Sequence, residues 1–191
     1  MEVLLVELTS WEVLRVIKGP RNDFPAVIGE RYNNFIMPKT PVLNHNIGFY
    51  LTGYTDGEGC FCVSFSLKKK LLSKLEIRPS FSVSQNSDRR EVLDLFRRYF
   101  DCGSIRPDRS DKTLKFEVRS LKNLREKVIP HFIKYPLWSS KQKDFEKFSE
   151  VCQLMSQKVK RKTILTKIIN IAYGMNSGIR KYNREQLLKL I

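Results

Sequence analysis

Two segments of the chain alternate apolar and polar residues in the pattern of half-buried strands. Between Cys60 and Lys68, phenylalanine, valine and leucine hold the odd positions, while cysteine, serine and lysine hold the even ones. The stretch from Leu75 to Gln85 repeats the pattern, with apolar residues at positions 75, 77, 81 and 83. Side chains of a strand point alternately to opposite faces, so each segment has one apolar and one polar face. We expect the two strands to form a long hairpin around the basic turn 68–70.

The same alternation predicts a second hairpin from 103–108 and 113–119, with apolar residues at positions 114, 116 and 118. Between the hairpins, apolar residues at intervals of three and four predict a helix. Asp88 and Glu91 have the spacing of a capping box at its start, and Gly103 is expected to end it.

Helical spacing continues towards the C-terminus. A helix from Leu121 to Val128 is expected to stop at Pro130, because proline lacks an amide hydrogen and its ring clashes with the preceding turn. Another helix is expected to be capped near Ser140, and a third is expected to open with the basic run Lys158–Lys162. Asn183 is suited to cap a short last helix.

The segment before the first strand is also helical in character, with Asn46 suited to cap it and Gly59 to end it. The predicted order is therefore α-β-β-α-β-β-α, an α+β fold with an antiparallel sheet and additional C-terminal helices. We assign this domain to residues 45–191.

Residues 1–44 are interpreted as an N-terminal arm or linker. Positions 18–43 are rich in glycine, proline and asparagine and have no sustained period. Positions 1–17 are apolar but contain Glu2, Glu7 and Glu12 and have no basic leading segment, so we expect neither a signal peptide nor a membrane span. The acids also argue against an imported-organelle presequence, which leaves a cytosolic protein or one made inside its organelle.

The charge of the chain narrows the class of partner. The net charge of +15 and the isoelectric point near 9.8 favour a polyanion, with nucleic acid first; a ribosomal or merely basic globular protein is the alternative. The four cysteines form no Cys-x-x-Cys pair and only two histidines are present, which argues against a zinc finger and against a histidine-based nuclease site. Free thiols in a reducing compartment are the simplest interpretation of the cysteines.

The polar face of the predicted sheet has the mixed donors and acceptors that base readout in the DNA major groove requires. A face built only to hold phosphates would be more uniformly Lys and Arg. Any antiparallel sheet with one wet face shows such alternation, so the pattern alone does not decide. The residues expected to contact DNA are Cys60, Cys62, Ser64, Ser66, Lys68, Glu76, Arg78, Ser80, Ser82, Arg106, Lys115, Glu117 and Arg119.

The helix before the first strand carries two glycines four residues apart, Gly53 and Gly57. Each glycine in a helix interior costs about 1 kcal/mol relative to alanine, so the pair indicates close approach by a second backbone. Asp56 and Glu58 lie in the last turn, where carboxylates are unfavourable unless a cation offsets them. A metal ion at Glu58 would do so.

Residues 51–59, Leu-Thr-Gly-Tyr-Thr-Asp-Gly-Glu-Gly, resemble the LAGLIDADG motif of the homing endonucleases. The leucine, the first and last glycines and both acids are kept. Thr52, Tyr54, Thr55, Gly57 and Glu58 depart from the motif. Residues 81–90 resemble the second strand of that family and the start of its next helix, and residues 138–145 resemble the segment that supplies its active-site lysine. No second copy of the motif is found.

The resemblance implies a site-specific DNA endonuclease with the αββαββα fold. It implies that Glu58 and the Gly57 carbonyl bind Mg²⁺, that Gln85 orients water, that Arg89 supports the water network and that Lys141 stabilises charge or tunes the nucleophile. Mn²⁺ is expected to substitute, and Ca²⁺ to support binding without cleavage. Asp56 is expected to be structural.

One motif per chain implies a homodimer that packs Gly53 and Gly57 of each subunit together on a long, roughly palindromic duplex. The protein is expected to be intron-encoded in a mitochondrion or chloroplast, with no membrane partner. One alternative is a maturase on the same fold that binds intron RNA, and another is a descendant that only binds DNA, such as a repressor.

Overall fold

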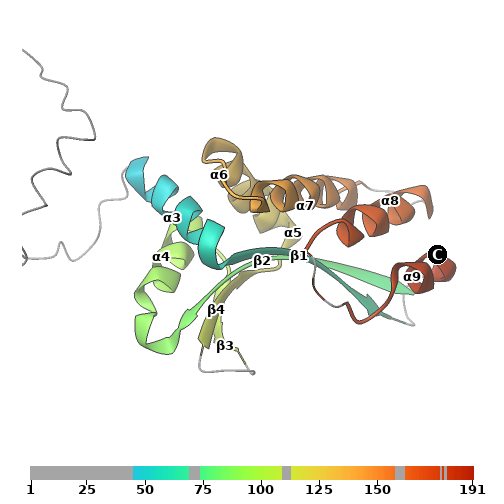
Figure 1. Cartoon of the computed structure of the whole chain (residues 1–191), viewed down its shortest axis with the longest axis horizontal. Helices are drawn as coiled ribbons and strands as arrows, with labels where there is room; N and C mark the ends of the chain where they lie inside the picture. Colours follow the sequence, from blue (N-terminus) through green and yellow to red (C-terminus); the bar gives the residue numbers. More distant parts are fainter. Residues whose placement is uncertain (1–44, 69–73, 109–112, 158–161, 177, 179) are drawn as a thin grey trace, which may run out of the picture. The chain divides into compact units, whose positions relative to one another are not determined.

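The computed structural model describes residues 45–68, 74–108, 113–157, 162–176, 178 and 180–191. The predicted arm 1–44 and most of the basic run Lys158–Lys162 lie outside these residues. The first part of the described chain follows the predicted order (Figure 1): α3 (His45–Glu58), β1 (Gly59–Leu67), β2 (Leu75–Asn86), α4 (Glu91–Phe100), β3 (Ser104–Pro107), β4 (Thr113–Val118), α5 (Leu121–Asn123) and α6 (Ile129–Lys134). It continues with α7 (Lys141–Met155), α8 (Lys162–Tyr173) and α9 (Arg184–Leu190).

The four strands form one antiparallel sheet in the order β1-β2-β4-β3. The first hairpin pairs Gly59 with Val83 and Leu67 with Leu75. The hairpins join through β2 and β4, where Phe81 faces Val118. The expected α+β fold is confirmed.

The apolar face of the sheet is covered by helices (Figure 1). Phe61, Phe81 and Phe116 are almost fully buried there. The ring of Phe132 in α6 lies 5.1 Å from that of Phe61, and the ring of Phe148 in α7 lies 5.4 Å from it, measured between centroids. Close packing of these rings on one side leaves the other side of the sheet to polar residues.

Pro130 does not end its helix, contrary to the prediction. A π turn at Leu124–Val128 connects α5 to α6, and Pro130 lies in the first turn of α6. The amide of Ile129 donates to the carbonyl of Leu124, five residues earlier. A wider π turn shifts the hydrogen-bond ladder, so the missing amide and the ring of the proline are accommodated.

The predicted helix caps were less accurate. A 3₁₀ turn at Ser87–Arg89 precedes α4, which has no side-chain cap, so the Asp88–Glu91 capping box is wrong. Asn46 lies inside α3, which begins at His45. Ser140 forms no cap for α7. Short polar side chains have several local hydrogen-bonding options, and the tertiary contacts choose among them.

The C-terminal segment covers the edge of the sheet at β1. Asn176 Nδ2 donates to the carbonyl of Phe61 at 2.8 Å, and Arg180 Nη1 donates to that of Val63 at 3.0 Å. Asn183 caps α9 as predicted, in a capping box with Gln186. The side chains thereby satisfy carbonyls of an edge strand that would otherwise be open for pairing.

A buried histidine links the helices that lie over the sheet. Thr52 Oγ1 donates to the carbonyl of Tyr135 at 3.1 Å, so this hydroxyl accepts from His131 Nε2 at 3.2 Å. His131 Nδ1 then accepts from the hydroxyl of Tyr99 at 3.0 Å. The neutral imidazole with its proton on Nε2 satisfies all three partners.

His131 predicts a loss of stability in mild acid. Burial lowers the pKa of His131 from 6.5 to about 4, so the unfolded chain binds one more proton than the folded one between these values. The free energy of unfolding should therefore fall by about 3 kcal/mol as the pH drops from 6.5 to 4. Urea unfolding across this range measures the effect, and His131→Gln should remove most of this part of the pH dependence. An unchanged pH profile in that variant would contradict the assignment.

No helix among the described residues has both the length and the apolar character needed to cross a membrane.

Candidate active site and nucleic-acid interface

The helix α3 turns a flat face to solvent. Gly53 and Gly57 are exposed, and a Cβ added at either would meet no atom within 4 Å. Phe49 and Tyr50, one turn earlier, are 61% and 52% exposed. The opposite side of the helix is buried through Leu51 and Thr55. This glycine face has open space beside it, and the packing of a second backbone there stays a prediction.

Glu58 is the last residue of α3 and its side chain is exposed. Among the described residues, its carboxylate has no hydrogen bond or ion pair. The carbonyl of Gly57 lies beside it, at the end of the helix where the backbone dipoles place partial negative charge. Glu58 and Gly57, the two residues predicted to bind a metal ion, are thus adjacent and exposed at this end of the helix.

Lys141 holds the carbonyl end of α3. Its Nζ donates to the carbonyls of Thr55 at 2.7 Å and Asp56 at 2.9 Å, and lies 3.5 Å from that of Gly57. Burial lowers the pKa of Lys141, an effect that the carboxylate of Asp56 opposes most strongly. The lysine is thus a fixed cation at the helix C-terminus.

Asp56 makes the reciprocal contact from α3 to the start of α7. Its carboxylate accepts from the Trp138 amide at 2.8 Å and from the Ser139 hydroxyl at 2.6 Å. Burial would raise the pKa of Asp56, but these hydrogen bonds outweigh burial and lower the pKa. Ser139 Oγ also accepts from the Lys141 amide at 3.1 Å. The structural role expected of Asp56 is consistent with these contacts.

Gln85 and Arg89 approach the same end of α3 from β2 and the turn after it. Gln85 Nε2 donates to the hydroxyl of Tyr54, while its carbonyl oxygen accepts from the Asn86 amide at 2.7 Å. Burial and then the charge of Glu58 raise the pKa of Tyr54, whereas the charge of Arg89 opposes the rise. Gln85 thus contacts the motif helix at Tyr54 and Lys141 contacts its carbonyl end, while Arg89 and Glu58 both act on Tyr54 through their charges.

Tyr54 belongs to this cluster through its hydrogen bond with Gln85, although in the sequence it stands out only as a departure from the motif. Its hydroxyl, in place of an apolar side chain, is the signal that could have marked it.

Glu58 and Gly57 fit a metal site whose remaining ligands come from nucleic acid and water better than a site formed by protein side chains alone. Among the described residues no group of three or more His, Cys, Asp or Glu side chains is placed to hold a metal ion. Mg²⁺ prefers six oxygen ligands and often keeps water or takes phosphate oxygens, so one carboxylate and one carbonyl suffice when a nucleic acid completes the shell. Glu58 and Gly57 are suited to that arrangement.

The polar face of the sheet carries the predicted DNA-contacting residues. Cys60, Ser64, Lys68, Arg78, Arg106 and Arg119 are exposed, whereas Cys62, Ser66, Glu76, Ser80, Lys115 and Glu117 are partly buried. Ser82 is an exception to the prediction because it is only 9% exposed. It lies between Cys60 and Glu117 in the middle of the sheet, where its neighbours limit access to a short side chain.

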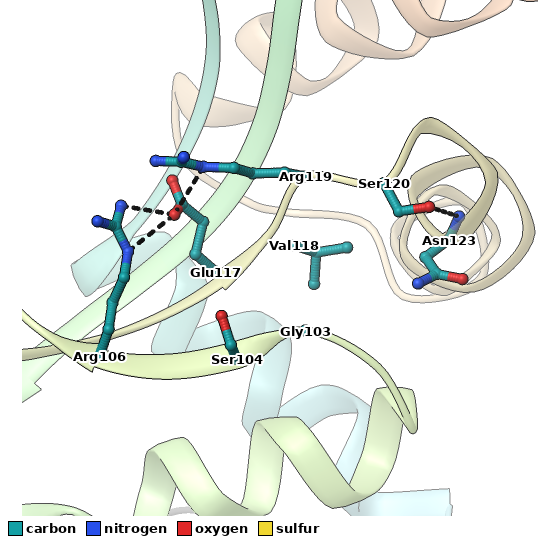
Figure 2. A pocket seen from close by; sticks show the side chains of 8 residues that line it. All are labelled: Gly103, Ser104, Arg106, Glu117, Val118, Arg119, Ser120 and Asn123. Atoms are coloured by element: carbon teal, nitrogen blue, oxygen red, sulfur yellow. Dashed lines mark hydrogen bonds and ion pairs between the residues drawn. The ribbon is translucent and has the colours of Figure 1, made fainter.

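A pocket of about 270 Å³ lies beside this face, where β3 and β4 meet the start of α5 (Figure 2). Arg106, Glu117 and Arg119 form one wall and are connected to each other by ion pairs. Ser120 and Asn123 lie on the other side, where the Ser120 hydroxyl accepts from the Asn123 amide at 3.4 Å. The charged groups around the pocket are therefore already paired.

The family model described as LAGLIDADG endonuclease matches residues 51–152, which is more than half of the chain. The chain belongs to the LAGLIDADG endonuclease family. The matched region runs from the motif helix through α7 and includes every residue of the cluster around Glu58.

Similar proteins support the assignment. The crystal structure of the homing endonuclease I-TnaI is 32% identical, with a TM-score of 0.67 over 75% of this chain and 94% of that one. The I-LtrWI LAGLIDADG homing endonuclease bound to target DNA is 31% identical, with a TM-score of 0.65 over 71% of this chain and 46% of that one. Homing endonuclease I-ApeII of Aeropyrum pernix is 27% identical over 74% of this chain and 88% of its own length.

Some relatives are considerably longer. The chain spans 32% of the length of probable intron-encoded endonuclease 2 of Neurospora crassa. It spans 24% of a Podospora anserina protein described as lying in ND4 intron 1.

Proposed function

We propose that this LAGLIDADG protein is a site-specific DNA endonuclease that hydrolyses phosphodiester bonds in both strands with a divalent metal ion. The main support is the Glu58 carboxylate at the end of a glycine-faced helix, which has no hydrogen bond or ion pair with the described part of the chain, together with Lys141, Gln85 and Arg89 near this helix. The names of the relatives, and the target DNA bound to I-LtrWI, support the same class of activity and partner.

The residues of the cluster have distinct roles in this proposal. Glu58 and the Gly57 carbonyl hold Mg²⁺, which when bound supplies Lewis-acid stabilisation of charge on the scissile phosphate. Gln85 orients the attacking water, with Tyr54 holding the Gln85 amide, and Arg89 supports the water network. Lys141 adds a fixed positive charge near the phosphate. Mn²⁺ substitutes for Mg²⁺, and Ca²⁺ supports binding without cleavage.

The active assembly is a homodimer that binds a long pseudo-palindromic duplex. The exposed glycine face of α3 supports this proposal because it can pack against its symmetry mate. Glu58 lies at the end of the same helix, so two facing helices place two carboxylates together. Each subunit then reads one half-site with its sheet.

We also propose that the protein is encoded within an intron of an organellar gene, because relatives of this chain are described as intron-encoded. The maturase alternative, with intron RNA as its partner, is not favoured by these endonuclease names.

The activity predicts metal-dependent cleavage of a defined sequence. We expect the purified full chain with Mg²⁺ to cut a small set of related duplexes from a random library, on both strands, and to cut nothing in EDTA. Sequencing of the cut ends measures this result. Enrichment of bound but uncut sequences in Mg²⁺ would identify a binding-only protein, and cleavage in EDTA would contradict the role of metal.

A further inference from the structure

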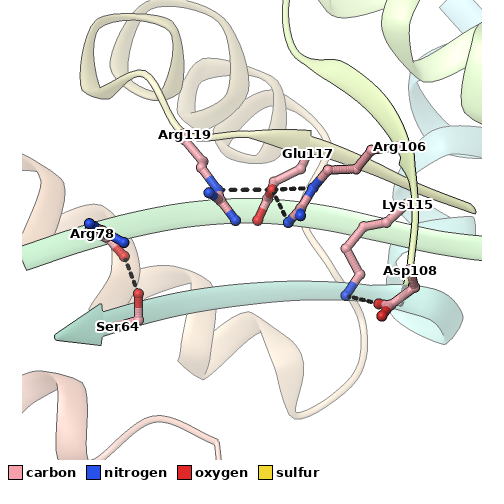
Figure 3. A network of polar contacts seen from close by, with 7 residues as sticks. All are labelled: Ser64, Arg78, Arg106, Asp108, Lys115, Glu117 and Arg119. Atoms are coloured by element: carbon pink, nitrogen blue, oxygen red, sulfur yellow. Dashed lines mark hydrogen bonds and ion pairs between the residues drawn. The ribbon is translucent and has the colours of Figure 1, made fainter. Parts of the chain in front are cut away.

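Three arginines on the polar face of the sheet are each held by a carboxylate of the same face. Figure 3 shows the two of them, Arg106 and Arg119, that share Glu117. Arg106 donates from Nε at 3.1 Å and from Nη2 at 2.6 Å to one oxygen of Glu117. Arg119 Nε lies 2.9 Å from that same oxygen. Glu117 is therefore shared by Arg106 of β3 and Arg119, which directly follows β4.

Arg78 repeats this geometry on β2. It donates from Nε at 2.9 Å and from Nη2 at 2.6 Å to one oxygen of Glu76. The same oxygen accepts from the Ser66 hydroxyl at 2.8 Å, which fixes the carboxylate from the neighbouring strand. The hydrogen bonds from Arg78 and then Ser66 lower the pKa of Glu76, so the pair stays ionised at neutral pH.

The carboxylates contact each guanidinium on the side of its Nε atom. The opposite end of the group, formed by the outward N–H bonds of Nη1 and Nη2 and called here the terminal fork, is left for another ligand. None of the described residues forms a hydrogen bond or ion pair with the Nη1 atom of Arg78, Arg106 or Arg119. The three side chains are 46%, 49% and 59% exposed, so these forks are accessible from solvent. A side chain already held by its carboxylate loses less conformational freedom when its fork binds a ligand.

The charge balance of this cluster argues against phosphate as the main ligand. Lys115 is paired with Asp108 at 2.7 Å. Together with the three arginines it makes four cations, which are paired with the three carboxylates of Glu76, Glu117 and Asp108. The cluster therefore carries one net positive charge. The whole chain carries +15. Phosphate binding would be strongest where cations are unpaired, whereas base edges require oriented donors more than net charge.

Glu117 itself is poorly placed to read a base. Its side chain is only 9% exposed, and the contacting oxygen already accepts from two arginines. These contacts favour a supporting role for Glu117 over the direct DNA contact expected from the sequence.

We propose that Arg78, Arg106 and Arg119 read guanines in the major groove and that Glu117 is a positioning residue shared by two of them. The free fork of an arginine matches the O6 and N7 acceptors of guanine, which is the commonest specific contact between proteins and DNA. Base preference at the positions faced by Arg106 and Arg119 is consequently coupled through one carboxylate. This inference rests on the proposed function and specifies part of the half-site.

The test is a selection of bound duplexes from a random library, at one fixed salt concentration, with the full chain and its variants. Wild type should enrich guanine at the positions read by the three arginines. Arg106→Ala and Arg119→Ala should each lower guanine preference at one position, by roughly 5- to 150-fold. Glu117→Ala should lower it at both of those positions together, while affinity for unrelated DNA rises because a negative charge is lost.

Glu126→Ala is the matched control, because it removes the same charge from an exposed site on the π turn. It should leave every base preference unchanged. Thermal unfolding of Glu117→Ala shows whether the variant is folded, and Glu117→Gln, which keeps the shape, provides a second test of coupled loss at the two positions.

Several outcomes would overturn the proposal: a change at one position only in both Glu117 variants, uniform weakening of all sequences by the arginine variants, or enrichment of bases other than guanine. Failure of the proposed function looks different: a protein that does not recognise DNA would enrich no sequence at all, and a binding-only protein would enrich sequences here but leave them uncut in Mg²⁺.

Discussion

Glu58→Gln is expected to reduce DNA cleavage by orders of magnitude while specific DNA binding persists. The substitution keeps the size of the side chain but removes the charge that would hold a divalent metal at the end of α3. The carboxylate has no hydrogen bond or ion pair with the described residues, so its loss should not disturb the fold. Binding in EDTA should tighten, because a negative charge near the phosphates is removed.

Cleavage of a selected target and gel-shift titration of the same duplex measure the two effects separately. Glu126→Gln serves as the control for the loss of one carboxylate at an exposed site on the π turn. Cleavage by Glu58→Gln at the wild-type rate in Mg²⁺ would move the catalytic centre elsewhere and leave the motif helix as an interface only.

Gly53→Leu is expected to convert the protein to a monomer and to abolish double-strand cleavage. Nothing lies within 4 Å of a Cβ added at this glycine, so a leucine meets no obstacle within its own chain. A facing helix would be pushed away by the added side chain, and two Glu58 carboxylates could no longer come together.

Sedimentation velocity at micromolar concentration measures the oligomeric state. Gly178→Leu is a matched control, because a Cβ there also meets open space but lies outside α3. A wild-type protein that sediments as a stable monomer, or a Gly53→Leu variant that remains dimeric, would contradict the proposed assembly.

The strands could be predicted from the sequence because their signal is local and repeated. A strand with one buried face must alternate, and a shift by one residue would bury serine and lysine instead of Phe61 and Val63. The sequence wrongly predicts that the helix stops at Pro130, because a proline alone does not show whether the preceding turn widens into a π turn that can accept it. Ser140 does not cap α7, where the Ser139 hydroxyl accepts from the Lys141 amide instead, and Asp88 does not cap α4 because a 3₁₀ turn over Ser87–Arg89 precedes that helix.

The candidate site could be predicted in composition but not in its internal contacts. The motif resemblance identified Glu58, Gln85, Arg89 and Lys141, and the fold brings them to one end of α3. That Lys141 holds the carbonyls of this helix could not be foreseen, because the contact spans more than 80 residues and involves backbone atoms with no sequence signature. Pairing of Arg106 with Glu117 likewise depends on the register of β3 against β4.

The contacts of Asp56 with Trp138 and Ser139, and of Lys141 with the carbonyls of α3, also fix one helix relative to another. They attach the end of α3 to the start of α7, and α7 in turn packs on the sheet through Phe145 and Phe148. In the proposed endonuclease, the reading surface and the cutting point therefore move as one rigid body. The offset between the recognised bases and the cut phosphates would then be a fixed property of the fold, so changing the reading residues should change which sequence is cut without changing where the cut falls within it.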